Sequence, residues 1–245
     1  MLYTAVSASP PSSFCTTGGG SARTWDPVVR LLESQFRCVA YDQRGWGSSD
    51  APAEGYSLHD LAQDARMLIQ TLGLRRFVLV GHLMGGKAAQ LLASQRPAGL
   101  EGLILVAPAS PCPQHIPEEA REAQLHAYDN RQSALAAIEF LTVRRPEEVV
   151  VERLVQDSLA GSPGAKLAWP TSAAYEDISD QVPRIAVPTL ILVGDHDRQD
   201  PEEQQRNEVL PLISQAKLEV IAECGHLIPV DQPSALARAI QQFLA

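Results

Sequence analysis

Hydrophobic and polar positions follow two different periods along this 245-residue chain. Short and nearly unbroken apolar runs occur at 36–42, 77–82, 100–109, 188–195 and 217–223. Such runs are typical of strands in a parallel sheet that is covered on both faces. Longer segments between them carry apolar residues on one helical face. This alternation predicts an α/β fold with a mostly parallel central sheet and helices on both sides.

Three segments show the helical period most clearly. In 56–73 the apolar residues fall on one face, and Ser57 and Asp60 have the spacing of a capping box. We expect a second helix at 84–97 and a last one that begins at Pro233. These helices would cover the faces of the sheet.

The regular alternation fails between residues 110 and 182. This stretch is polar and helix-prone, and it contains no convincing strand. We interpret it as a helical cap inserted into one larger domain. The expected division is a core formed by 1–109 and 183–245, with a cap formed by 110–182.

The net charge and the length of the apolar runs limit the kinds of molecule that the protein is expected to bind. A formal net charge of −9 at pH 7 argues against sequence-independent nucleic-acid binding and disfavours docking on anionic membranes. No apolar run approaches the ~20 residues needed to span a bilayer, and the first residues lack the pattern of a secretory leader. We therefore expect a cytoplasmic protein that binds a small molecule, not nucleic acid or a membrane.

The cysteines give no sign of a metal centre or a disulfide framework. Cys15, Cys38, Cys112 and Cys224 are scattered without ligand spacing, which favours isolated thiols in a reducing compartment. The glycine run at 18–20 lacks the ending of a phosphate-binding loop. We expect no metal and no cofactor.

Three loops that follow predicted strands carry candidate chemistry. Gly81 and Gly85 flank Leu83 in the turn after 77–82, as glycines flank the nucleophile of a G-x-S-x-G elbow. Asp197 lies in the loop after 188–195, and His226 lies in the loop after 217–223. Each loop alone could be structural, but the order elbow, acid and histidine is that of a catalytic triad.

With these loops the chain resembles the α/β-hydrolase superfamily from about residue 12 to 245. The segments "SARTWDPV" (21–28) and "YDQRGWGSSD" (41–50) resemble loops of these enzymes as well. The resemblance implies that Asp197 orients His226 as a base. It also implies an oxyanion hole formed by the backbone N–H groups of Met84 and Gly18.

The chain departs from the family pattern at two places. Leu83 stands where relatives carry a nucleophilic residue, and Thr16 and Thr17 occupy places where a His-Gly pair is usual. Cys15 lies near this loop, but its position at a strand end indicates burial rather than a substitute nucleophile. The aminoacrylate hydrolases of pyrimidine breakdown are loosely similar, because they combine a short N-terminus, an altered loop and an apolar elbow residue.

Leu83 rules out covalent serine catalysis and leaves several functions open. The favoured hypothesis is a small-molecule hydrolase of esters, lactones or enamines in which His226, oriented by Asp197, activates water. A non-hydrolytic base catalyst (a lyase, a cyclase or a cofactor-free oxygenase) and a non-catalytic ligand-binding protein are the alternatives. An engineered exchange of serine for Leu83 is less favoured, since alanine is the usual choice. The sequence is compatible with a homodimer.

Other conspicuous residues receive structural interpretations. We expect Arg44 and Trp46 to stabilise their loop, His82 to point into the sheet core, and Lys87 to be solvated or paired with a carboxylate. Several residues of the cap could either line a pocket or pack within the cap, namely His115, His126, Tyr128, Trp169 and Tyr175.

Overall fold

The computed structural model describes residues 12–15, of which it gives the backbone, and residues 20–245. Its centre is a six-stranded parallel sheet with the order β2-β1-β3-β4-β5-β6. The strands are β1 (Ser12–Cys15), β2 (Cys38–Ala40), β3 (Phe77–Leu83), β4 (Leu100–Pro108), β5 (Thr189–Gly194) and β6 (Ala216–Ile221). The parallel sheet predicted from the apolar runs is thus confirmed.

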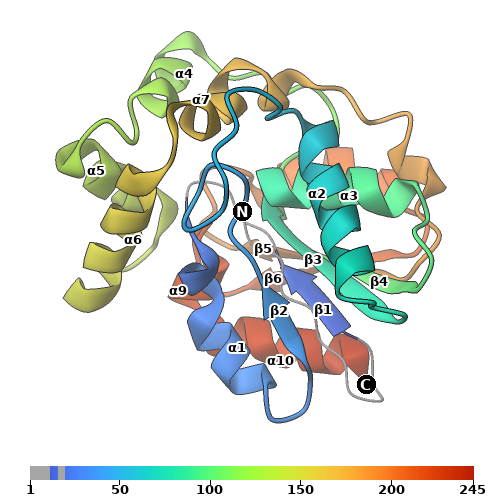
Figure 1. Ribbon diagram of the computed structural model, residues 1–245. Coiled ribbons are helices and arrows are strands. Elements are labelled where there is room, and N and C mark those ends of the chain that lie inside the picture. The colour runs from blue at the N-terminus through green and yellow to red at the C-terminus, as the bar shows by residue number, and fades with distance from the viewer. Residues whose placement is uncertain (1–11, 16–19) are drawn as a thin grey trace.

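Helices cover both faces of this sheet (Figure 1). One face packs against α2 (Leu58–Thr71) and α3 (Met84–Ser94), and the other against α1 (Asp26–Leu32) and α10 (Pro233–Leu244). Each face has its own apolar core, and the strand side chains contribute alternately to the two. The protein therefore has the three-layer α/β architecture that its sequence predicts.

Local signals explain where the helices begin and end. Ser57 caps α2, and both hydrogen bonds of the capping box with Asp60 are present. The helix expected at 84–97 ends earlier, at Ser94. Pro97 disfavours a helical backbone at the preceding residue, and Arg96 adopts a φ of 51°.

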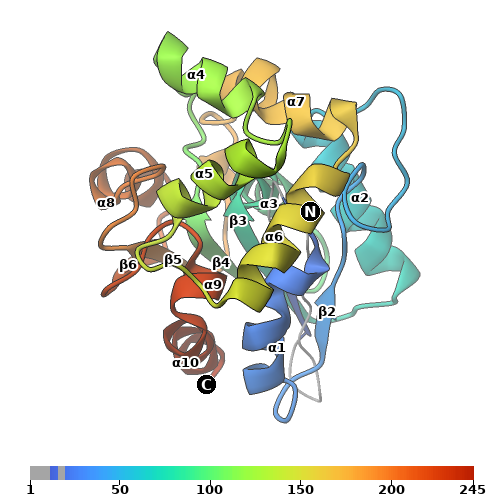
Figure 2. The ribbon, with the colours of Figure 1, turned by 90° about the vertical axis from the view of Figure 1, so that its left-hand side faces the viewer.

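Residues 110–182 form a layer of helices above the carboxyl ends of the strands (Figure 2). Its α-helices are α4 (Glu118–Leu125), α5 (Arg131–Leu141), α6 (Glu148–Ala160) and α7 (Pro163–Thr171). Helices α5 and α6 share a small apolar cluster of their own. We refer to residues 110–182 as the cap segment.

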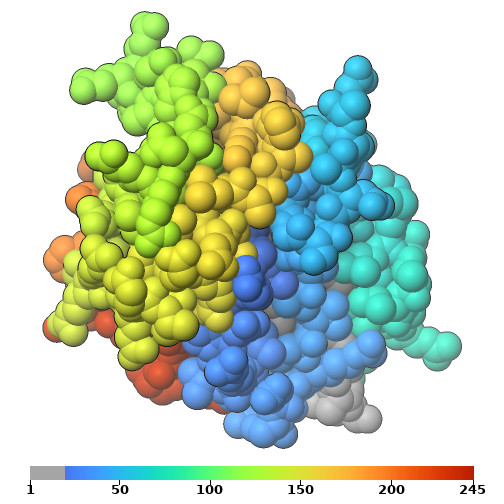
Figure 3. Space-filling model, turned by 60° about the vertical axis from the view of Figure 1, so that its left-hand side comes forward, coloured from blue at the N-terminus to red at the C-terminus, as the bar shows by residue number. Residues whose placement is uncertain are grey.

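The cap segment contacts the core beside the first helical turn of the chain. Asp157 of α6 is buried, accepts a hydrogen bond from Ser21 Oγ at 2.5 Å and pairs with Arg23. Gly161, just after α6, approaches the ring of Trp46 closely. Figure 3 shows the surface of the cap segment lying directly against the N-terminal part of the core.

Within the described ranges, no helix combines the length and the apolar character that crossing a bilayer requires.

Candidate active site

The turn that connects β3 with α3 has the backbone of a nucleophile elbow. Leu83 ends β3 and adopts a φ of 50° and a ψ of −122°. This left-handed φ costs about 1–3 kcal/mol for a residue other than glycine. A Cβ at Gly81 would lie 2.5 Å from the Gly85 carbonyl oxygen, so the flanking backbones leave room only for glycine. The turn is preserved, although its central residue has no nucleophilic atom.

His226 and Asp197 lie together beside this turn. The His226 Nδ1 atom is 3.0 Å from Asp197 Oδ2 and 3.2 Å from Oδ1, and both side chains are buried. Asp197 Oδ1 also accepts backbone N–H bonds from Gln199 and Asp200, each at 2.9 Å. These bonds hold the carboxylate in place, so that it can orient the imidazole ring.

The two side chains shift each other's pKa. Burial alone would raise the pKa of Asp197, but the charge and hydrogen bond of His226 outweigh it and keep that pKa below its usual value. Burial alone would lower the pKa of His226, but Asp197 outweighs it and raises that pKa. The Nε2 atom of His226 is buried and has no hydrogen-bond partner among the described residues. This nitrogen is the atom that would meet the proton of a nucleophile.

Two further carboxyl groups lie in the same loop and have separate roles. Asp195 accepts the backbone N–H groups of Glu223 and Cys224, both at 3.0 Å, and so joins the two loops. Asp200 Oδ2 lies 3.9 Å from His226 Nδ1, and burial raises the pKa of Asp200 to about 7. Of the three, Asp197 has the geometry of the partner of His226.

His82 is buried, as expected, but it faces the site. Its Nε2 atom lies 2.9 Å from the His226 carbonyl oxygen, and the two ring centroids are 4.8 Å apart. Burial lowers the pKa of His82 to about 3, so its ring is neutral. His82 therefore contacts both the backbone and the ring of His226.

The expectation that Lys87 is solvated or paired with a carboxylate is wrong. Lys87 is fully buried, and its Nζ atom donates to the carbonyl oxygens of Cys112 at 3.0 Å and Ala174 at 3.3 Å. Every residue of α3 is buried, so no side of this helix leads to solvent. Burial lowers the pKa of Lys87 to about 8.

A cavity of about 520 Å³ lies between the elbow and the cap segment. Leu83 and Met84 contribute to it from the core, and His226 is not among its lining residues. The cap segment supplies most of the wall: Ala120, Ala123, Gln124, His126, Ala127, Tyr128, Ser133, Ala136, Ala137, Phe140, Leu141, Ala165, Lys166, Trp169 and Pro170. The remaining lining residues are Trp46 and Gln199.

Some of the residues singled out from the sequence line this cavity and others do not. His126, Tyr128 and Trp169 line the cavity, whereas His115 and Tyr175 do not. Trp46, expected to stabilise its loop alone, also lines the cavity, since the cap segment packs onto it. Arg44 does stabilise the loop, through a two-pronged bond to Asp64 with both distances 2.6 Å.

Of the two residues predicted to form the oxyanion hole, the structure describes one, Met84. Met84 begins α3, so its backbone N–H belongs to the first turn, where no intrahelical partner exists. Gly18, with Thr16 and Thr17, lies outside the described residues. Of Cys15 only the backbone is described, so its expected burial remains a prediction.

The remaining chemistry-bearing groups do not form a second centre. Among the described residues no cluster of His, Cys, Asp or Glu could hold a metal ion. Cys38, Cys112 and Cys224 are free thiols, and burial raises the pKa of Cys38 to about 12.

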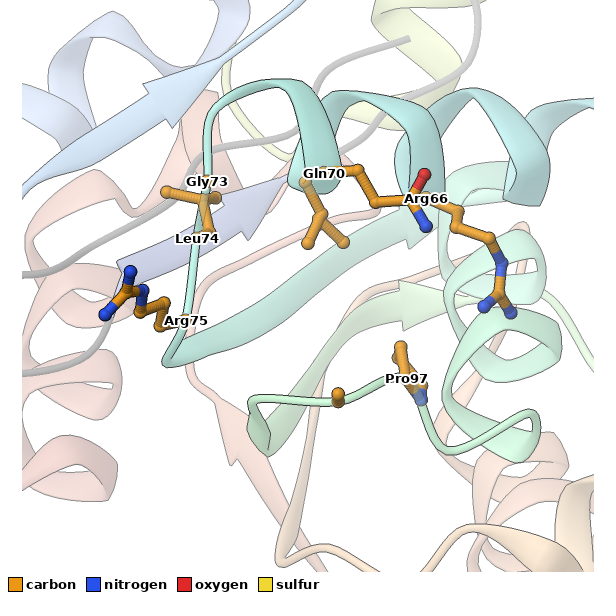
Figure 4. Close-up of a pocket in the computed structure, with 8 residues that line it drawn as sticks. Arg66, Gln70, Gly73, Leu74, Arg75 and Pro97 are labelled. Atoms are coloured by element: carbon orange, nitrogen blue, oxygen red, sulfur yellow. The ribbon is translucent and has the colours of Figure 1, made fainter.

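Another hollow, of about 280 Å³, lies at the opposite end of the sheet, where α2 ends and β3 begins (Figure 4). Its two arginines, Arg66 and Arg75, point to opposite sides and do not converge on a common point. This hollow has no arrangement of groups suited to catalysis.

The sequence did not predict two features of the site, the burial of Lys87 and the position of Trp46 at the cavity. Both depend on packing between segments, whereas Asp200 is recognisable from the sequence as a carboxyl group close to Asp197. A signal was available for Lys87: the helix around it reads "MGGKAAQLLAS", which is apolar or small on almost every side.

Comparison with known proteins shows which fold family the chain resembles. The sequence pattern of the α/β hydrolase fold family matches residues 14–233. A protein of Variovorax paradoxus named for a carbamate hydrolase activity, RutD, is 30% identical over 238 residues, covering 93% of this chain and 88% of the relative. The 3-oxoadipate enol-lactonase 2 of Acinetobacter baylyi is 26% identical over 247 residues, covering 96% and 88%.

The structure is also similar to solved structures of other proteins. An esterase from Exiguobacterium antarcticum superposes with a TM-score of 0.85 at 26% identity, covering 94% of this chain and 90% of the esterase. The names of these similar proteins are those of hydrolytic enzymes. From its parallel sheet, its elbow and its sequence pattern, the chain belongs to the α/β hydrolase fold family.

Proposed function

We propose that this protein is a small-molecule hydrolase that works without a covalent intermediate, with His226 and Asp197 activating water. The observation that carries the proposal is the buried His226–Asp197 pair, whose outer nitrogen has no partner among the described residues. A base that is oriented by a carboxylate accelerates proton transfer by about 10²–10⁴-fold. The substrates would be activated esters, lactones or enamines held under the cap segment.

The role of the cavity follows from its lining. Substrate would lie between Leu83 and the cap segment, against a mostly apolar wall that excludes bulk water. Because Leu83 lines the cavity and His226 does not, we infer that the Leu83 side chain separates the two. Rotation of Leu83 would admit a water molecule to Nε2. The N–H of Met84, together with Gly18, would stabilise the developing oxyanion.

The proposal makes no use of a metal or a cofactor. We further propose that the chain acts in the cytoplasm, that residues 110–182 form its cap, and that any self-association is a homodimer. Light scattering after gel filtration would measure the mass of the particle in solution.

Turnover of a panel of activated esters, lactones and enamines tests the proposal. We expect the wild-type protein to hydrolyse at least one of them and His226→Ala to lose at least about 10²-fold in rate. His196→Ala is the matched control, because His196 is an exposed histidine of the neighbouring loop and should leave the rate unchanged. Equal rates for wild type and His226→Ala would refute the proposal.

A second candidate is a ligand-binding protein that has lost turnover. The burial of Nε2 favours it, since a base closed off from its substrate cannot act. The Leu83→Ala variant distinguishes the two candidates, because it removes most of the side chain that is proposed to separate the cavity from His226. A hydrolase should gain activity in Leu83→Ala. A binding protein should show no turnover in wild type or in Leu83→Ala, and it should return its ligand unchanged.

A further inference from the structure

We propose that the cavity takes a small, largely apolar molecule that carries a carboxylate, and that the ammonium group of Lys166 binds it. This inference rests on the proposed function, because the substrate would occupy the same cavity. It adds the charge of that substrate, which nothing in the fold or in the loop motifs specifies.

The electrostatic character of the lining favours an anion. The chain has 29 acidic residues and a net charge of −9, yet no lining residue of the cavity is acidic. Two lining residues, His126 and Lys166, can carry a positive charge. The cavity is therefore an apolar space with basic groups in an otherwise acidic molecule.

The charge of His126 is already balanced. Its Nδ1 atom lies 2.6 Å from Asp129 Oδ2, and its Nε2 atom lies 3.2 Å from Glu122 Oε1. Hydrogen bonds and charges of these carboxylates, Asp129 first, raise the pKa of His126. An imidazolium between two carboxylates has little attraction left for a ligand.

Lys166 differs, because neutral oxygens hold its head group. The Nζ atom donates to the carbonyl oxygen of Tyr128 at 3.1 Å and to that of Leu159 at 2.9 Å. No carboxylate of the described residues forms an ion pair with it. The two bonds hold the ammonium group in place, and since an ammonium group has three N–H donors, one is left after them.

A ligand carboxylate would complete this arrangement. A charge-assisted hydrogen bond is stronger than one between neutral groups, and the apolar surroundings strengthen it further. An uncharged ligand of the same shape would leave the ammonium unpaired. The geometry thus predicts a preference for acids over amides of equal size.

Lys166 also has a purely structural explanation, and the test must distinguish this explanation from anion binding. Leu159 lies in the last turn of α6, and a lysine commonly bonds to the free carbonyls at a helix end. A lysine with that role alone would not distinguish an acid from its amide.

Isothermal titration with 3-phenylpropanoate and 3-phenylpropanamide tests the inference, since the two differ chiefly in charge. For wild type we expect the acid to bind about tenfold more tightly or better. Lys166→Met should abolish this preference. Lys217→Met removes an exposed lysine of β6 and should retain it.

Three results would overturn the inference: equal binding of acid and amide to wild type, a preference that survives in Lys166→Met, or no binding of either compound at millimolar concentration. Thermal unfolding checks that each variant is folded, and Lys166→Arg, which keeps the charge, should keep the preference. Binding needs no turnover, so an inactive protein that prefers the acid would contradict the proposed function and still support this inference.

Discussion

At the residue scale, position 83 decides the chemistry open to this site. Leucine removes the hydroxyl group that a histidine–carboxylate pair deprotonates in covalent hydrolases, yet the backbone retains the strained elbow. What remains is the buried imidazole of His226, whose pKa depends on its neighbours. The pKa of His226 is therefore the quantity that mutations of those neighbours should change.

The variant Asp197→Asn tests how His226 is held. Because Asp197 outweighs burial and raises the pKa of His226 above 6.5, wild-type kcat/KM should rise with pH through an inflection above 6.5. The amide variant keeps the burial and loses the charge. We expect its inflection at lower pH and its maximal rate to fall.

A pH–rate profile of both proteins measures this effect. Asp195→Asn serves as the control, since Asp195 lies in the loop of Asp197 and accepts hydrogen bonds from the backbone of Glu223 and Cys224, not from His226. An inflection that stays in place in Asp197→Asn would contradict the assigned pairing.

Asp200 should make the stability of the fold depend on pH. Burial raises its pKa from 3.8 to about 7, so the folded protein holds this proton more tightly than the unfolded chain. The contribution of this bound proton to the free energy of unfolding is fully present below pH 3.8. It is lost as the pH rises to about 7, by at most about 1.4 kcal/mol per pH unit.

The isosteric variant Asp200→Asn lacks this titration. The free energy of unfolding of wild type should therefore fall relative to Asp200→Asn between pH 4 and pH 7, and the difference should be constant above about pH 7. Urea denaturation at several pH values measures it. A difference that does not change with pH would show that Asp200 is ionised in the folded protein.

At the scale of elements, small residues set how closely the cap segment approaches the core. Gly161 follows α6 with a φ of −58°, a conformation open to any residue. A Cβ there would lie 2.3 Å from the nearest atom of the Trp46 ring. The glycine is required by contact and not by backbone conformation.

We therefore expect Gly161→Ala to lower the free energy of unfolding by about 1–3 kcal/mol through overpacking. Displacement of Trp46, which lines the cavity, should also raise KM. Denaturant unfolding and steady-state kinetics measure the two effects. In a Trp46→Leu background the same change should cost clearly less, and an equal cost in both backgrounds would rule out the clash as its cause.

The elements that could be predicted from the sequence are those with strong local signals. The apolar runs gave β3, β4 and β5 to within one or two residues, and Ser57 and Pro233 marked where helices begin. The run at 36–42 yielded only the three residues of β2, because the extent of a strand depends on its partner and not on its own hydrophobicity.

The site likewise has parts that could be predicted from the sequence and parts that could not. The order of the loops was enough to predict that Asp197 and His226 would meet beside the elbow, because the carboxyl ends of parallel strands share one edge of a sheet. The hydrogen-bond partners of Lys87 and Lys166 could not be predicted, because they are backbone carbonyls of other segments.

At the scale of the whole molecule, topology and charge act together. The sheet order places the ends of β3, β5 and β6 on one side, and the cap segment closes that side with an acid-free lining. The chain as a whole has a formal net charge of −9 at pH 7. In the proposed function, the cap segment therefore selects the substrate and the core supplies the base.

The mass of the intact protein during turnover tests whether water attacks the substrate without an acyl intermediate on the protein. Wild type and Leu83→Ser would be quenched within seconds of mixing with an ester that wild type hydrolyses, and then weighed by mass spectrometry. We predict that wild type releases product while its mass stays unmodified, and that Leu83→Ser gains the mass of the acyl group. An acyl adduct on the wild-type protein would contradict direct attack by water.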